Sequence, residues 1–192
     1  MSDTAQVISN PVEISAVAQL GDEAMALARP EMHPVDFVML LMNQKLYSDA
    51  VRFLAHAMPR REAVWWGWMC ARRVSEQKST PPVKAALEIT EKWIAQPSEE
   101  NRRAAHAAAE KATLGTAAGC AALGAFFSGG SIAPPEAPPV PPGEFLTAKA
   151  ISGAVIFAAL SGAPLEAPEK FNSFVAQGLD VTNRIKLWQS KQ

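Results

Sequence analysis

PRREAVWWGWMCARR, residues 59–73 of this 192-residue chain, is the stretch around which the protein is organised. The apolar residues from Val64 to Ala71 point in every direction around a helical axis, which is typical of a buried helix. Pro59 suits the first turn of that helix, and the arginines at both ends carry the helix termini into water. We therefore expect a helix from Pro59 to about Glu76 at the centre of the fold, packed around Trp65, Trp66 and Trp68.

The same three tryptophans, flanked by arginines, could instead form a cation-π surface or a surface for stacking nucleic-acid bases. Core packing is the favoured interpretation, because the predicted helix has no polar face.

Helical patterns continue on both sides of this stretch. Upstream, Val12–Leu27 is interrupted at Gly21-Asp22 and indicates two short helices, and further helices are predicted at 34–41 and 48–58. Downstream, Thr80-Pro81-Pro82 starts a helix that ends near Pro97, and Ser98 caps an alanine-rich helix that ends at Ala112. The segment 168–188 is amphipathic. Its apolar face predicts that it closes the core, with docking to a partner as the alternative.

A short internal echo links two of these helix starts. Ala57-Met58-Pro59 is followed by Glu62, and 38 residues later Ala95-Gln96-Pro97 is followed by Glu100. This offset falls between known helical-repeat lengths, so it suggests a repeated helical hairpin without establishing one.

Two uncharged segments rich in small residues, 113–127 and 150–165, flank a proline-rich stretch. Each is too short or too weakly apolar for a typical membrane span, so both are expected to pack within the protein. The prolines between them, from Pro134 to Pro142, favour an extended polyproline II loop. Such a loop either connects two parts of one core or docks into an aromatic-lined groove on another protein.

These patterns predict an all-α protein of about seven or eight helices, packed as successive helical hairpins. The whole chain, 1–192, is interpreted as a single helical domain from which a proline-rich loop at 129–143 projects.

Composition narrows the classes of partner and compartment. The formal net charge of −1 gives no broad attraction to nucleic acid, and membrane association is not favoured. Cys70 and Cys120 each lie in an apolar stretch and are predicted to be buried free thiols, which fits a reducing compartment. The N-terminal residues, Met1 to Val12, lack the basic and apolar regions of a secretory signal. A cytoplasmic location is therefore expected, with export that needs no cleaved signal left open.

The residue types that usually carry chemistry do not form a pattern. His33, His56 and His106 are scattered without a second ligand at helical spacing, so no metal site is predicted. We interpret His33 as a turn residue and the other two as solvent-facing. No phosphate-binding glycine loop and no nucleophile elbow occur, so no cofactor and no catalytic residue are expected, and the protein is predicted not to be an enzyme.

The run from Pro59 to Trp66, with Cys70-Ala71-Arg72 one turn later, resembles the signature of an uncharacterised family of short helical bacterial proteins. Members of that family accompany genes of contractile type VI secretion systems. The resemblance implies an accessory role as an adaptor or chaperone, and it brings no catalytic residues with it.

The leading functional hypothesis is therefore a non-enzymatic interaction protein whose partner is another bacterial protein, with the oligomeric state left open. The candidate partner-binding residues belong to the proline loop and to the C-terminal segment: Pro138, Pro139, Pro141, Pro142, Leu187 and Trp188. The alternative is a small toxic or membrane-acting protein that inserts the apolar segments 113–127 and 150–165.

Overall fold

The computed structural model describes residues 10–75 and 79–189, and this part of the chain is helical without any strand. The predicted all-α class is confirmed. The helices are α1 (Pro11–Val17), α2 (Asp22–Leu27), α3 (Pro34–Asn43), α4 (Tyr47–Ala57), α5 (Arg60–Ser75), α6 (Pro81–Ala95), α7 (Glu99–Ala112), α8 (Ala117–Phe126), α9 (Leu146–Leu160), the 3-10 helix η1 (Pro164–Glu166) and α10 (Ala167–Arg184).

The helix count is slightly above the predicted seven or eight, since the described residues contain ten α-helices. Short helices such as α1 and α2 are separate elements because the chain breaks at Gly21, the N-cap of α2. The N-terminal residues 1–9, predicted to lack a signal, and Glu76, the predicted end of the central helix, lie outside the described residues.

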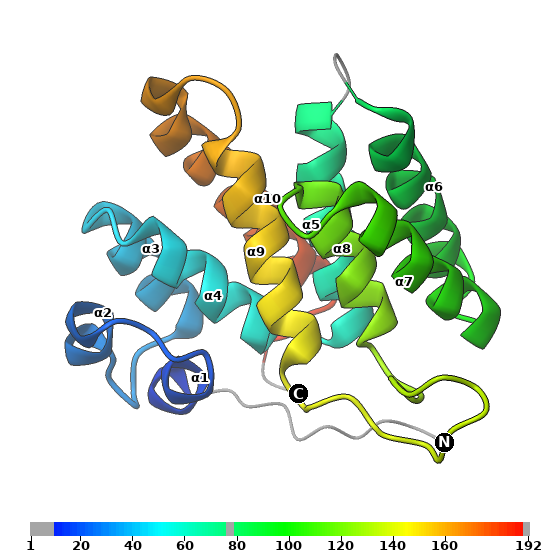
Figure 1. The fold of residues 1–192 in the computed structure, drawn as a ribbon. Helices are drawn as coiled ribbons and strands as arrows, with labels where there is room; N and C mark the ends of the chain where they lie inside the picture. The colour runs from blue at the N-terminus through cyan, green and yellow to red at the C-terminus, as the bar shows by residue number, and fades with distance from the viewer. Residues whose placement is uncertain (1–9, 76–78, 190–192) are drawn as a thin grey trace.

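Helix α5 lies at the centre, as its sequence predicts, and packs against α6, α8, α9 and α10. From α5 onward each helix packs on the next one along the chain, which is the arrangement of successive hairpins. Helix α4 instead packs on α9. Figure 1 shows α1 to α4 on one side of the molecule, α6 and α7 on the opposite side, and α5, α8 and α9 between them.

The three tryptophans of α5 play different parts. Trp66 is fully buried, and Trp68 is nearly so and donates its indole N–H to the Leu87 carbonyl of α6. Trp65 is only half-buried. The Arg184 guanidinium lies over the Trp65 ring, 6.0 Å from the ring centroid. The core therefore centres on Trp66, and cation-π contacts occur at the edges of the helix.

The two apolar segments flanking the proline loop form core helices. All residues of α8 except Leu123 are buried, and α8 packs against α5, α6, α7 and α9. Cys120 in α8 and Cys70 in α5 are buried free thiols, as predicted, and burial raises the pKa of both.

Among the described residues no single helix has the length and apolarity to cross a bilayer. Helix α9 reaches that length and apolarity only when it is joined with Pro164–Arg184, and the two parts are bent by 118° relative to each other.

The C-terminal helix α10 closes the core with Phe171, Phe174, Val175 and Val181, all buried. It ends at Arg184, earlier than the predicted residue 188, because the chain leaves the helix through Lys186, which has a positive φ of 54°. Left-handed backbone conformations of this kind end helices. Leu187 and Trp188 therefore follow a turn and are not on the helical face.

Candidate functional site

A pocket of about 590 Å³ opens at one end of the helical bundle. It is lined by the first residues of α5, α7 and α9, by the last residues of α4, and by the segment that leaves α8. The antiparallel hairpins produce this meeting point, because alternate helices start and end at the same end of the bundle. Its volume lies within the range of ligand-binding pockets, roughly 300–1,000 Å³.

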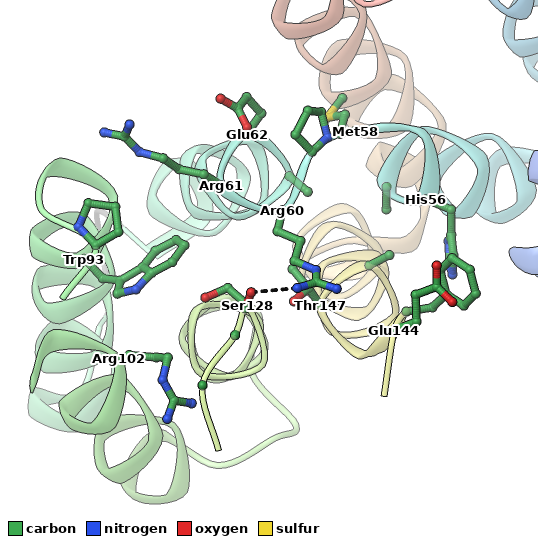
Figure 2. Close-up of a pocket in the computed structure, with 18 of the residues that line it drawn as sticks. His56, Met58, Arg60, Arg61, Glu62, Trp93, Arg102, Ser128, Glu144 and Thr147 are labelled. Carbon is green, nitrogen blue, oxygen red and sulfur yellow. Dashed lines mark hydrogen bonds between the residues drawn. The ribbon is translucent and has the colours of Figure 1, made fainter. Parts of the chain in front are cut away.

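Arginines at this end bind the carbonyl groups that helix C-termini leave without partners. Arg61 donates to the Ile94 carbonyl of α6 at 2.9 and 2.6 Å. Arg60 donates to the Ser128 carbonyl beyond α8 at 3.0 Å (Figure 2). Terminal carbonyls carry partial negative charge, so a guanidinium is a suitable partner.

Arg102 of α7 is the most buried of these arginines, with 4% of its side chain exposed. It donates to both carboxylate oxygens of Glu99 at 2.7 Å, to the Phe126 carbonyl at 2.6 Å and to the Ser131 carbonyl at 2.8 Å. Hydrogen bonds from Arg102, together with the one from Arg103, lower the pKa of Glu99 to about 2. This single side chain thus joins α7, the end of α8 and the start of the proline loop.

Two polar side-chain atoms at the pocket, one in Thr147 and one in His56, are buried without a hydrogen-bond partner among the described residues. Thr147, in the first turn of α9, is 2% exposed, and its hydroxyl contacts no donor or acceptor among the described residues. His56 of α4 holds Nδ1 2.7 Å from the Arg52 carbonyl and leaves Nε2 without a partner within the same residues. Unsatisfied buried polar groups are rare in proteins, so each calls for an explanation.

The protonation of His56 follows from its contacts. A carbonyl can only accept a hydrogen bond, so Nδ1 carries the proton and the neutral ring presents a lone pair at Nε2. Burial lowers the pKa of His56, the positive charges of Lys149 and Arg52 add to this lowering, and the hydrogen bond to Arg52 opposes it. Figure 2 shows His56 beside Glu144 on one side of the pocket, with Arg102 on the opposite side.

Charges of both signs line the pocket in equal number. The cations are Arg60, Arg61 and Arg102, and the carboxylates are Glu62, Glu99 and Glu144. Apolar side chains cover much of the rest of the wall, notably Met58, Trp93, Phe145 and Leu187. The pocket is therefore an amphipathic cavity with little net charge.

The proline loop begins and ends at this pocket, since Gly129, Gly130 and Glu144 belong to its lining. Figure 1 shows the loop, in yellow-green, running along one end of the molecule from α8 to α9. Gly130 has a positive φ of 64°, and a Cβ there would lie 2.9 Å from Arg102 Nε and from Glu99 Oε2. Both the backbone conformation and the close approach to Arg102 therefore require glycine.

Hydrogen bonds at the base of the loop fix its shape. Arg103 donates to the Ala133 carbonyl at 2.7 Å, which adds to the bond from Arg102 to Ser131. The Ser131 hydroxyl accepts from the amides of Ala133 and Val140, and the Ile132 amide donates to the Val140 carbonyl at 2.8 Å. The loop is thus closed on itself and attached to α7.

A model of a family of unknown function, DUF6931, matches residues 37–182. The chain belongs to this family. The match to DUF6931 extends from α3 into α10, so it includes Arg102, the whole proline loop and the pocket lining except Leu187. Trp188 also lies outside it. Comparisons with curated proteins and with solved structures found no match.

Of the predicted partner-binding residues, four lie inside the DUF6931 match. Pro138, Pro139 and Pro141 are exposed, and Pro142 is half-buried. Leu187 lines the pocket, 44 positions beyond the loop in sequence but at the same end of the molecule. Trp188 is half-buried, and its ring meets His33 edge-on with 6.4 Å between centroids. The structure therefore places the loop and Leu187 around one region.

The histidines differ in part from their predicted places. His33 is the N-cap of α3 and accepts from the Val35 amide, so it is the expected turn residue. His106 is half-buried and stacks on Phe126 at 4.1 Å, and His56 lines the pocket, so neither faces solvent freely. Within the residues searched, no group of three or more His, Cys, Asp or Glu side chains is placed to hold a metal ion.

Sequence reasoning missed Arg60, Arg102, Thr147 and His56 as members of one site. One signal pointed toward it: the two copies of the echo, at Pro59 with Glu62 and at Pro97 with Glu100, mark the starts of α5 and α7. Both prolines line the pocket. The two helix starts that share this echo therefore form two walls of the pocket, and no sequence pattern marks the third wall, at the start of α9.

Proposed function

We propose that this DUF6931 protein is a non-enzymatic interaction protein that binds another protein through its proline loop. The main support for the proposal is that the base of the loop is held by hydrogen bonds while the prolines in its middle are exposed. Ser131, Arg102 and Arg103 hold the base, whereas Pro138, Pro139 and Pro141 are exposed. A loop that served only as a connector would need neither the prolines nor three side chains to fix it.

Pre-ordering favours binding, because an ordered loop loses little conformational entropy when a partner docks. Proline-rich segments are recognised by grooves lined with aromatic side chains, which pack against the pyrrolidine rings. Val140, 46% exposed, lies among the exposed prolines and adds an apolar contact. The partner proposed is therefore a protein with an aromatic-lined groove.

The resemblance of the central helix to proteins that accompany type VI secretion loci extends this proposal. In that setting the chain would act as an adaptor or chaperone for another bacterial protein. The cytoplasm is the compartment proposed for it.

Site-specific photo-crosslinking tests the proposal. A photoreactive amino acid replaces Val140 in the full chain, the protein is expressed in its native cell, and the crosslinked partner is identified by mass spectrometry. The same partner is then purified and its affinity is measured for wild type and for the triple variant Pro138→Ala, Pro139→Ala, Pro141→Ala. We expect the triple variant to lose at least ten-fold in affinity with an unchanged melting temperature, because these prolines are exposed.

The matched control changes exposed apolar residues far from the loop. Met39→Ala in α3 and Leu165→Ala in η1 remove side chains that are 47% and 95% exposed. The control should bind the partner as wild type does. Equal binding by the triple variant, or a protein that crosslinks to nothing, would overturn the proposal.

The alternative function, insertion of segments 113–127 and 150–165 into a membrane, has less support. It requires α8 to leave a position in which nearly all its residues are buried. Leakage of dye from liposomes, together with sedimentation of the protein with them, would favour this alternative over the interaction role.

A further inference from the structure

The arginines that line the pocket at the starts of α5, α7 and α9 are held by the protein itself. Arg60 donates to the Ser128 carbonyl, and Arg61 donates to the Ile94 carbonyl. Arg102 donates to a carboxylate and to two carbonyls at and beyond the end of α8. We therefore assign none of these cations to a ligand, and the groups left for one lie elsewhere in the lining.

The end of α4 and the start of α9 bring together polar groups that the described chain does not engage. They are His56 in α4, Glu144 just before α9, and Thr147 in the first turn of α9. The Thr147 hydroxyl and His56 Nε2 have no hydrogen-bond partner, and the exposed Glu144 forms no ion pair within the same residues. Figure 2 shows His56 and Glu144 side by side.

The hydroxyl of Thr147 departs from the usual local pattern. Helical serines and threonines often donate to the carbonyl four positions earlier, as Thr90 and Ser152 do in this protein. For Thr147 that carbonyl belongs to Gly143, and it accepts instead from the Leu146 amide at 3.1 Å. Thr147 is 2% exposed, and buried polar groups are rarely left unpaired. A ligand that bonds to the hydroxyl would account for a threonine at this position.

The three groups differ in the hydrogen bonds that they can make. His56 Nε2 can only accept, because Nδ1 holds the proton toward the Arg52 carbonyl. An ionised Glu144 carboxylate also only accepts, whereas the Thr147 hydroxyl can donate. A ligand that satisfies all three brings two N–H donors and one acceptor. A primary carboxamide carries this set in one planar group.

Charge favours a neutral head group over either kind of ion. A carboxylate would face the Glu144 carboxylate and the lone pair of His56, and both would repel it. Burial first, and then the positive charges of Lys149 and Arg52, lower the pKa of His56. An ammonium group beside His56 would meet the same two cations. The lining as a whole has equal numbers of cations and carboxylates, so it attracts neither ion strongly.

The rest of the wall suits an apolar body attached to the amide, since the lining includes the side chains of Met58, Trp93, Phe145 and Leu187. The two unpaired atoms are covered by their neighbours, so a ligand reaches them after side-chain rotations. Threonine has two common rotamers in helices, and rotation about the Cα–Cβ bond moves the Thr147 hydroxyl. Phe145 is half-buried, with its ring 5.8 Å from that of His56, and we assign to it the movement that uncovers Nε2.

We propose that this pocket binds a primary carboxamide borne on an apolar body, held by His56 Nε2, the Glu144 carboxylate and the Thr147 hydroxyl. Two sources share this chemistry: an asparagine or glutamine side chain within an apolar peptide, and a small aliphatic amide. Pro138, Pro139 and Pro141 do not line the pocket, so this site and the proposed docking of the proline loop can fail independently.

A titration of the full-length protein, followed by NMR, tests the site with probes that differ only in the head group. The small probes are hexanamide, hexanoate and hexylamine. The peptide probes are acetyl-Leu-Gln-Leu with an N-methylamide end and the same peptide with glutamate in the middle. We expect the amide of at least one set to bind about ten-fold more tightly than its charged counterparts. Tighter binding of the glutamine peptide than of hexanamide identifies a protein ligand, and the reverse identifies a small amide.

A site-specific signal accompanies this binding. The imidazole nitrogen resonances of His56 should shift at Nε2 when the amide binds, because the lone pair gains a hydrogen bond. The resonances of His33 should stay unchanged, since His33 does not line the pocket.

Two variants locate the amide. Thr147→Val keeps the shape of the side chain and should weaken amide binding about ten-fold. Its control is Thr90→Val, because Thr90 is buried, bonds to the Ala86 carbonyl and does not line the pocket. Glu144→Ala changes an exposed residue, so the fold is retained, and it should weaken hexanamide and strengthen hexanoate. Its control is Glu136→Ala, an exposed loop carboxylate outside the lining.

Several results would overturn the proposal. Equal affinities for the three small probes would show that only the apolar body is recognised, and tighter binding of an acid or of the amine would show a charged ligand. Glu144→Ala with wild-type affinities for all probes, or no shift at His56 Nε2, would place the amide elsewhere. Failure of both amides to bind at millimolar concentration also overturns it.

Discussion

The indole N–H of Trp66 donates a 2.9 Å hydrogen bond to the backbone carbonyl of Phe174, which joins α5 to α10 across 108 positions of sequence. The bond fixes the ring against Gly178, one turn further along α10. A Cβ at position 178 would lie 2.9 Å from Trp66 Cε2 and 3.2 Å from Leu54 Cδ1. The indole of Trp66 therefore packs against α10 at a position where α10 has no side chain.

Gly178→Ala should destabilise the protein by about 1–3 kcal/mol, because the added methyl group forces the buried indole to move. This loss occurs although alanine favours helix by about 1 kcal/mol over glycine. Urea unfolding gives the change in free energy. The control is Gly153→Ala in α9, where the new Cβ would lie 3.5 Å from Cys120 Sγ, an ordinary contact. The control should be neutral or stabilising, and a stabilising Gly178→Ala would contradict the packing described.

Arg102→Met should lower the free energy of unfolding by about 2–5 kcal/mol, because it leaves the carbonyls of Phe126 and Ser131 without their donor. The same change should release the loop. Hydrogen exchange at the Ile132 and Val140 amides, which are bonded within the loop, should then become faster. Arg103→Met is the comparison, since Arg103 is 27% exposed and donates to a single loop carbonyl. Its effect on stability should be clearly smaller.

Glu99 makes the stability depend on pH in the acid range. Its pKa is about 2 in the folded protein against an ordinary value of 4.5, so between these values the unfolded chain binds the proton more readily. Stability is then present above about pH 4.5 and is lost progressively as the pH falls toward 2. Glu99→Gln should show a flatter dependence over this window in urea unfolding. Identical slopes for variant and wild type would show that the contacts with Arg102 and Arg103 do not perturb Glu99.

His56 makes the stability of the protein depend on pH at higher pH values than Glu99 does. Its folded pKa lies below the ordinary value of 6.5, so below about pH 6.5 the unfolded chain takes up the proton first and stability falls. The nearby positive charges of Arg52 and Lys149 work in the same direction. A proton NMR titration should place the His56 midpoint below those of histidines in a denatured sample. His56→Gln should remove part of the loss in stability between pH 7.5 and 5.5, and a midpoint above 6.5 would contradict this prediction.

Most of the fold could be predicted because local signals and burial agree. The all-round apolar pattern of α5 indicates a central helix, and prolines or capping residues mark the starts of α3, α6 and α7. The details that could not be predicted depend on contacts between residues that are distant in the sequence. Trp65 and Trp66 are adjacent and chemically identical, yet they meet different parts of α10. Trp66 bonds to the Phe174 carbonyl and is fully buried, whereas Trp65 contacts Arg184 at the end of α10 and is half-buried.

The site could not be predicted for a similar reason. In sequence, Glu99 and Arg102 form an ordinary pair three residues apart on a solvated helix face. The acceptors that bury Arg102 lie 24 and 29 positions away, at Phe126 and Ser131. Thr147 likewise has no distinguishing neighbours, and only the meeting of three helix starts gives its hydroxyl a place in a pocket.

The anchoring of the proline loop by α7 makes its surface a property of the folded molecule rather than a portable linear motif. A peptide copied from residues 129–143 contains Ser131 but neither Arg102 nor Arg103, so it lacks the donors that hold Ser131 and Ala133 in place. A partner that binds the loop would therefore distinguish folded protein from nascent or damaged chains. Peptides copied from the loop would compete only weakly with the folded protein for that partner.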